Sequence, residues 1–408
     1  METPTTETAV TANHPNPSHS PLVEVLWLFL RLGFTAFGGP AAHIAMMREE
    51  VVRKRQWVSS ERFVDLIGIT NLIPGPSSTE LAIYLGYLRA GWLGLLVAGV
   101  CFIGPAMLIV LALAWVYVTY GALPQIGWLF YGIQPVVVTI IAQAIWNLGR
   151  TVFKGKLSVG LAILVLVCYF LGVNVLILLF GGAALYGLLR LLITRWHKKP
   201  PVTSLVVPLL GANLQAIFEP LGSFMRTGAA APISLGLVFL TFLKLGSVVY
   251  GSGYTLLAFL RIDLVQNLHW LTDKQLLDAV SIGQFTPGPV FTTATFIGYV
   301  IGGWPAALLA TLAMFLPSFV LIALIHPVAS RFRQATWTAT LLDGVNAAAL
   351  ALMVGVLVQL GQHALMDVLT WAITLLTLVV LLRFKLNSVW LILAGAVIGV
   401  LRFWIFGG

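Results

Sequence analysis

FLRLGFTAFGGP, from Phe29 to Pro40, followed by DLIGITNLIPGP, from Asp65 to Pro76, occurs a second time in related form as FLKLGSVVYGSG, from Phe242, and DAVSIGQFTPGP, which ends at Pro289. The two 48-residue stretches align without a gap at a shift of 213 residues, and 14 positions are identical. After a one-residue slip the match continues, for example from Gly132 to Gly344. A duplicated apolar chain that is broken at matching places is typical of a secondary transporter.

The composition indicates a membrane protein. Of the 408 residues, 59% are hydrophobic and 9% are charged, whereas a soluble domain carries about 25% charged residues. Because a soluble fold of this size cannot bury so much apolar surface, we expect a polytopic membrane protein. The two cysteines, Cys101 and Cys168, lie in apolar stretches and offer neither a disulfide framework nor a metal site. No metal or cofactor is expected.

The duplication divides the chain into four parts. Residues 1–21 form a Thr- and Pro-rich tail that is expected to be disordered, and residues 22–194 form the N-terminal transporter repeat. Residues 195–231, which open on a basic run, are interpreted as a cytoplasmic linker. Residues 232–408 form the C-terminal repeat.

The second apolar segment of each half contains Pro-Gly-Pro, at 74–76 and at 287–289. Two prolines around a glycine end one helix and begin another, so the segment either crosses as a discontinuous helix or enters the bilayer and returns. If it returns, 18 of the 23 Lys and Arg residues fall on one side of the membrane, as the positive-inside rule requires. This favours about five transmembrane spans plus one re-entrant hairpin per half, the first span being 22–47. An odd number of spans inverts the second half, so the expected fold is an all-α polytopic membrane protein of two inverted repeats, with both termini outside.

Two cations lie deep in the opening segments, Arg31 in the first half and Lys244 at the matching position. A cation inside a bilayer costs at least about 2.5 kcal/mol unless it faces a cavity or a partner. Each is therefore a candidate anion-binding charge, and a structural ion pair or snorkelling to the surface is the alternative. The glycines beyond them, Gly38, Gly39 and Gly251, would permit close backbone approach.

Small hydroxyl residues follow both Pro-Gly-Pro breaks. A helix N-terminus presents free N–H groups and partial positive charge, to which hydroxyls add donors. Two such ends meeting near the midplane would bind a small oxyanion, although the hydroxyls could also simply cap their helices. The candidate binding residues here are Pro74, Gly75, Pro76, Ser77, Ser78, Thr79, Pro287, Gly288, Pro289, Thr292 and Thr293.

Three acids are candidates for proton coupling. Glu80 follows the first break and has no acidic counterpart in the second half. An intramembrane carboxylate is a functional candidate by default. Asp65 and Asp278 match across the repeat, and the simpler interpretation of both is that they favour the helix dipole near a capped helix start.

These motifs resemble the chromate ion transporter (CHR) family. The similarity rests on Phe-Gly-Gly-Pro at 37–40, on Gln56-Trp57, and on the run from Asn71 through Pro-Gly-Pro to Ser77, with an echo at 284–289. The similarity covers about residues 22–405, and the chain resembles the long, two-domain class of the family. The resemblance implies an inner-membrane carrier that exports chromate, is driven by the proton motive force and confers chromate resistance, with sulfate as a competing look-alike of the substrate. It maps the family's signature positions to Gly38, Gly39, Pro40 and 74–76.

The sequence thus predicts a secondary transporter for a tetrahedral oxyanion, with alternating access around a midplane site. An anion channel of the same architecture, or a carrier of sulfate or another oxyanion, is the alternative. An intramembrane enzyme is not favoured, because no His-Glu-x-x-His motif or nucleophile and base pair stands out. The expected partners are the oxyanion and the lipid bilayer, a homodimer is left open, and the net charge of +9 reflects basic loops rather than nucleic-acid binding.

Overall fold

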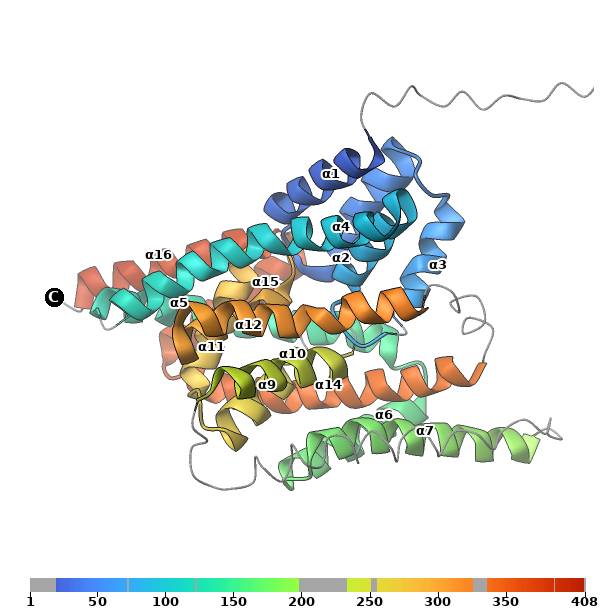
Figure 1. Cartoon of the computed structure of the whole chain (residues 1–408). Coiled ribbons are helices and arrows are strands. Elements are labelled where there is room, and N and C mark those ends of the chain that lie inside the picture. Colours follow the sequence, from blue (N-terminus) through green and yellow to red (C-terminus); the bar gives the residue numbers. More distant parts are fainter. Residues whose placement is uncertain are drawn as a thin grey trace, which may run out of the picture.

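The computed structural model describes residues 20–71, 73–121, 123–197, 233–250, 255–325, 336–384 and 386–406. All regular elements within these ranges are helices, as predicted (Figure 1). Residues 1–19 of the predicted tail at 1–21, most of the linker at 195–231 and the candidate Gly251 lie outside the described residues, and α1 begins at Pro21, the last residue of that tail.

The helices fall into two sets in matching order. The first half contains α1 (Pro21–Thr35), α2 (Gly39–Arg48), the π-helix η1 (Glu49–Lys54), α3 (Ser60–Thr70), α4 (Ser77–Tyr120), α5 (Pro124–Val152), α6 (Lys156–Phe170) and α7 (Val175–His197). The second half contains α9 (Leu235–Val248), α10 (Leu256–Leu260), the π-helix η2 (Arg261–Asn267), α11 (Asp273–Phe285), the 3-10 helix η3 (Val290–Thr292), α12 (Thr293–Ile325), α14 (Thr336–Ala364), α15 (Val368–Phe384) and α16 (Ser388–Phe406). Even the π-helical turns recur, directly after α2 and α10.

Six of the described helices are long and apolar enough to cross a membrane: α4, α5, α7, α12, α14 and α16. Three shorter apolar helices, α6, α9 and α15, accompany them. Large apolar side chains such as Trp92, Trp304 and Trp404 lie exposed on the outside of the molecule. An apolar exterior suits lipid, and the chain is a multi-pass membrane protein.

The predicted capped starts of α3 and α11 are confirmed. The Ser59 hydroxyl accepts a hydrogen bond from the N–H of Arg62 at 3.1 Å. At α11, Thr272 and Gln275 form a complete capping box, in which each side chain accepts from the other residue's backbone N–H. These caps satisfy donors that a helix start leaves unpaired.

The long helices α4 and α12 each fold back on themselves. Gly91 has φ 63° and Gly303 has φ 68°, a left-handed conformation that glycine adopts without strain. A Cβ on Gly86 would lie 2.3 Å from the carbonyl oxygen of Gly94, so the two arms of α4 pack backbone to backbone. The Arg89 guanidinium at the end of the first arm lies 5.4 Å from the ring of Trp57, which precedes α3. Residues 57–89 therefore return to the face they left, as a re-entrant hairpin does.

The opening segment differs from the single span predicted at 22–47. Glu24 at its start binds Arg89 at 2.7 Å, and Arg89 also contacts Trp57 at its end. A straight helix over these residues would separate Glu24 from Trp57 by roughly 50 Å. Instead the chain reverses between Ala36 and Gly39, and α1 runs beside η1, where Arg31 binds Glu50 at 2.6 Å. The segment is a second hairpin, and Lys244 binding Asp263 at 2.8 Å shows the same reversal in the second half.

The equivalent helices α5 and α14 run antiparallel. Tyr131 near the start of α5 donates to Asp367, just beyond the end of α14, at 2.7 Å. Lys154, just beyond the end of α5, binds Asp343 near the start of α14 at 2.9 Å. These two contacts occupy matching positions in the repeat, so the helices are related as inverted copies would be.

By their packing contacts the helices form two groups, and α12 of the first lies between α5 and α14 of the second in Figure 1. Helices α1–α4 and α9–α12, here called the hairpin bundle, pack closely among themselves, chiefly α1 on α4, α9 on α12 and α4 on α12. Helices α5–α7 and α14–α16, here called the scaffold, pack in the same way, chiefly α5 on α16 and α7 on α14. Contacts between the groups are fewer, although buried residues of α9–α12 share one apolar core with the scaffold.

Candidate functional site

The breaks of the two halves meet and hydrogen-bond one another. The Gly75 N–H in the first Pro-Gly-Pro donates to the carbonyl oxygen of Val249, which ends α9, at 2.7 Å. The Gly288 N–H in the second donates to the carbonyl oxygen of Ala36, which ends α1, at 2.8 Å. Each Pro-Gly-Pro thus satisfies the open end of the opening helix in the other half.

Each break also packs on a long helix of the other half. Gly75 has φ 140°, and a Cβ there would lie 2.7 Å from the Ser318 hydroxyl oxygen of α12 and 2.3 Å from Oε1 of Glu80. Gly288 has φ 90°, and a Cβ there would lie 2.7 Å from Cβ of Ala106 in α4. Glycine is required at both positions by the backbone conformation and by the close approach. We name the region around the four broken helix ends, at 36–40, 74–80, 249 and 286–293, the break centre.

A histidine connects the start of α4, which follows the first break, with the end of α1, which binds the second break. His43 of α2 is buried, its Nε2 lies 3.0 Å from the carbonyl oxygen of Ala36, and its Nδ1 lies 3.3 Å from the Ser78 hydroxyl. Because a carbonyl only accepts, Nε2 carries the hydrogen, and in the neutral ring Nδ1 accepts from Ser78. Since the same Ala36 carbonyl accepts from Gly288, one imidazole and one carbonyl connect both Pro-Gly-Pro motifs.

The hydroxyls that follow the two breaks are used differently. Thr292 and Thr293 each donate to the carbonyl three residues earlier, at 2.7 Å. In the first half, Ser77 is buried and Thr79 is fully buried, and the Thr79 hydroxyl has no hydrogen-bond partner among the described residues. The first half therefore holds the donor that is not engaged by its own helix.

Glu80 lies in the break centre and is fully buried. Its Oε1 lies 3.4 Å from the Ser318 hydroxyl, and its Oε2 has no hydrogen-bond partner among the described residues. A buried carboxylate is costly in its charged form unless it is paired or hydrogen-bonded. The arrangement leaves an acceptor, or a proton-binding oxygen, directed into the protein interior.

The cations Arg31 and Lys244 lie away from the breaks, each beside an acid at the matching position of its own half. Arg31 binds Glu50, which also binds Lys54 at 2.9 Å and Arg55 at 3.6 Å. The Arg31 side chain is 54% exposed and lines an open hollow of about 490 Å³ together with Arg55 and the apolar side chains of Trp27, Leu30 and Phe34. The Lys244 side chain is only 13% exposed. The ion pairs correspond to the structural alternative, while the excess positive charge around Glu50 leaves Arg31 available to an anion.

The matched acids Asp65 and Asp278 have different surroundings. Asp278 is buried and accepts from Tyr117 of α4 at 2.9 Å and from Gln134 of α5 at 2.8 Å. Asp65 on α3 is half-buried. Asp278 is the sixth residue of α11, beyond the first turn in which an acid favours the helix dipole, so its partners rather than the dipole account for its place.

The structure brings together most of the predicted site. The residues of the two Pro-Gly-Pro motifs and the hydroxyls after them lie in the break centre, and Gly38, Gly39 and Pro40 begin α2 two residues after Ala36. Sequence reasoning missed His43, Ser318 and Tyr117, whose partners lie 35 to 238 residues away in the chain. The available signal was that each is a polar residue within an apolar segment, which requires a partner.

This architecture defines a class: a polytopic membrane transport protein made of two copies of one helical unit, whose broken helices meet at a common centre. Comparison with known families identifies the particular one. The family described as "Chromate transporter" matches residues 23–188 and 236–400, one match per half, and the chain belongs to this family. The family's activity makes it an ion transporter for a small anion.

Curated relatives agree over nearly the full length. A protein of Cupriavidus metallidurans named "Chromate transport protein" is 34% identical over 396 residues, covering 96% of each chain. A "Probable chromate transport protein" of Synechococcus elongatus is 33% identical and covers 96% of this chain and 98% of its own. A "Chromate transport protein" of Pseudomonas aeruginosa is 30% identical and covers 87% of this chain and 84% of its own. No solved structure matches this chain.

Proposed function

We propose that this protein is a secondary active transporter that exports chromate, with sulfate as a competing substrate, by alternating access around the break centre. The observation that carries the proposal is the reciprocal pair of hydrogen bonds between the breaks, Gly75 to Val249 and Gly288 to Ala36. A site made by both copies can be opened to either side by moving the hairpin bundle against the scaffold.

The chemistry of the break centre suits a tetrahedral dianion. The start of α4 directs helix N–H groups and partial positive charge toward it. Ser77 and Thr79 bring hydroxyls to the same region, whereas Ser78, Thr292 and Thr293 would first give up the hydrogen bonds that they donate to His43 and to their own helix. Chromate and sulfate have the same shape and charge, so these donors would separate them weakly. Arg31 and Lys244 are predicted by the sequence to bind the anion directly. Here their proposed role is limited to electrostatic attraction of the anion toward the opening segments.

Glu80 is the proposed proton carrier, with Asp65 and Asp278 as less favoured candidates. Its carboxylate is buried beside the break centre and is not paired with a cation there. A dianion and a charged carboxylate repel one another, so anion binding and protonation of Glu80 should favour each other. A dianion that moves with one proton still carries one negative charge, and the membrane potential favours its exit by about 2.3 kcal/mol per 100 mV.

An anion channel on the same architecture is the competing function. The buried, cross-bonded breaks favour a carrier, because a channel needs a continuous polar path whereas here the break centre is closed by packed glycines and Ser318. Chromate resistance at the inner membrane is the proposed cellular role, and the relatives named chromate transport proteins support the transport step of this proposal.

Purified protein in liposomes tests the proposal. Radiolabelled chromate should accumulate against its gradient when a pH gradient or a membrane potential is imposed, unlabelled sulfate should compete, and Glu80→Gln should abolish the response to pH. Movement that only dissipates a gradient, at rates independent of the proton gradient, would establish a channel instead. The oligomeric state of the active protein, including the homodimer left open by the sequence, follows from single-particle bleaching in the same liposomes.

A further inference from the structure

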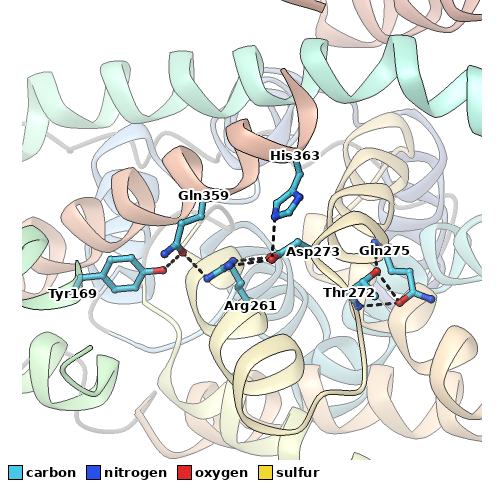
Figure 2. Close-up of polar contacts among 7 residues, drawn as sticks. All are labelled: Tyr169, Arg261, Thr272, Asp273, Gln275, Gln359 and His363. Carbon is cyan, nitrogen blue, oxygen red and sulfur yellow. Dashed lines mark hydrogen bonds and ion pairs between the residues drawn. The ribbon is translucent and has the colours of Figure 1, made fainter. Parts of the chain in front are cut away.

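A partly buried polar network joins the second-half hairpins to the scaffold (Figure 2). Arg261 of η2 is 8% exposed and makes a two-point contact with Asp273 of α11, at 2.6 and 3.0 Å. The remaining Arg261 nitrogen donates to Gln359 of α14 at 2.5 Å, and Tyr169 of α6 donates to the same amide oxygen at 2.6 Å. His363 of α14 lies 3.4 Å from Asp273.

The network crosses the boundary between the two bodies. Arg261 and Asp273 belong to the hairpin bundle, while Tyr169, Gln359 and His363 belong to the scaffold. On the same side of the bundle, α11 packs against α5, α14 and α16, and Asp278 accepts from Gln134 of α5. The second-half hairpins are therefore fastened to the scaffold.

At the positions that match Arg261, Asp273 and Gln359, the first half makes no such link to the scaffold among the described residues. The residue that matches Arg261 is Arg48, which is exposed and donates to the Ser60 hydroxyl at 3.1 Å, where the second half has Asp273. Asn147 and Thr151 stand where Gln359 and His363 stand in the other half. Within the described chain, α3 packs closely on α4, and it makes no contact with the scaffold as extensive as the contact that α11 makes. Figure 1 shows α3 well away from α6 and α7.

From this asymmetry we infer that Arg261, Asp273 and Gln359 form a latch. The latch holds the substrate site closed on the side where α10 and α11 lie, here called the second-half mouth. The site is free to open on the side where α3 lies, here called the first-half mouth. Release of Gln359 from Arg261 lets the hairpin bundle move away from α14, and the substrate site then opens at this mouth. Arg261 acts as a positioning residue and touches no substrate. This inference rests on the alternating-access mechanism proposed above.

The Asp367 cluster provides a matched control. Arg402 of α16 binds Asp367 at 2.7 Å and also contacts Tyr131 of α5. All three residues lie in or between scaffold helices, so breaking this cluster weakens the scaffold without unfastening the bundle. The variant Arg402→Gln should therefore leave the balance between the two mouths unchanged.

Transport from the two sides of the vesicle tests the latch. Gln359→Leu removes the bond between Arg261 and the scaffold and leaves the Arg261 and Asp273 pair, and the weaker contact of His363 with Asp273, in place. Since a hydrogen bond to a charged group is lost, the population open at the second-half mouth should rise about tenfold. The half-saturating chromate concentration should then fall when chromate is presented at that mouth and rise at the opposite one. Equal changes on both sides would overturn the latch, because loss of stability alone shifts both in the same direction.

Hydrogen exchange tests the latch without any transport. In protein free of substrate, Gln359→Leu should raise the rate of amide hydrogen exchange at least several-fold in α10 and α11 and leave the rate in α3 unchanged. The increase in α11 should be larger than the increase caused by Arg402→Gln. Unchanged exchange in α11 would exclude the latch even if chromate is carried. Faster exchange in α11 in a protein that carries neither chromate nor sulfate would keep the latch and reject the proposed function.

Discussion

At the scale of single residues, the candidate site depends on groups that are small or unpaired. Gly75 and Gly288 let the backbone of one half reach the helix ends of the other, and any side chain there would occupy the space of Glu80, Ser318 or Ala106. Glu80 is unusual for the opposite reason, because a large polar side chain is buried with one oxygen left without a hydrogen-bond partner in the described chain. Both features reduce stability, and a site that must bind and release an ion accounts for their presence.

We expect Gly75→Ala to abolish transport and to destabilise the protein by about 1–3 kcal/mol. The φ of 140° disfavours a side chain, and the new Cβ would lie 2.3 Å from Glu80. Thermal unfolding and chromate uptake in liposomes measure the two effects. The control is Gly68→Ala in α3, where a Cβ meets nothing within 4 Å and helix propensity should improve by up to about 1 kcal/mol. Normal uptake by Gly75→Ala would remove the break centre from the site.

Arg31→Gln and Glu50→Gln separate the two interpretations of the opening cation. Both break the 2.6 Å pair, but only the first removes positive charge. If Arg31 attracts the anion, Arg31→Gln lowers uptake about tenfold or more, while Glu50→Gln keeps most of it and both variants insert into the membrane. An equal loss in both variants would show that the pair is structural and would take Arg31 out of the site.

At the scale of elements, sharp reversals rather than straight spans place the site. The hairpins at 21–57 and 57–89 enter the molecule and return, and their tips hold the helix ends that bind the other half. The scaffold helices are bound at their ends by two matched charge clusters, around Asp343 and around Asp367. These clusters hold α5, α14 and α16 in register, and the hairpins attach to the scaffold through fewer contacts, chiefly those of α11.

The Asp367 cluster predicts a pH-dependent contribution to stability. Burial alone would raise the pKa of Asp367, which lies in the loop after α14, but hydrogen bonds from Tyr131, Thr370 and Arg402 outweigh burial and hold this pKa well below its usual value of 3.8. A lowered folded-state pKa stabilises the protein above the unfolded-state pKa, and that stability is lost as the pH falls toward the folded-state pKa. The difference in unfolding free energy between wild type and Asp367→Asn should therefore be full above about pH 5 and shrink below about pH 4. A difference that is constant with pH in detergent would contradict this assignment.

At the scale of the whole molecule, the two copies are alike in fold and unlike in attachment. The reciprocal contacts of α5 with α14 show that these matching helices run antiparallel, whereas among the described residues the Arg261 network fastens the second copy and has no counterpart in the first. A pseudosymmetric protein held in an asymmetric state can reach a second state by exchanging the attachments of its halves, which is the basis of alternating access.

Cysteine labelling tests the predicted orientation. Gly155→Cys, at an exposed site where a Cβ meets nothing, should be labelled from the cytoplasm, and a cysteine near Arg89 should be labelled from the same side. Met366→Cys, at a residue that is 69% exposed and lies at the opposite end of the α5 and α14 pair, should be labelled only from outside. Labelling of positions 155 and 366 from one side would show that the copies are not inverted in the membrane.

The sequence by itself determined the membrane class, the duplication, the positions of the Pro-Gly-Pro breaks and the starts of α3 and α11. Composition, glycine, proline and caps act through the local backbone and through the solvent, so their effect can be predicted from neighbouring residues. Only the tertiary structure decided that 22–47 folds back, that Arg31 and Lys244 pair with Glu50 and Asp263, and that His43 and Ser318 join the break centre. Each of these contacts depends on how segments distant in the chain pack together. The surface of an apolar helix fits many neighbouring helices about equally well, so the sequence does not predict which helices pack against one another.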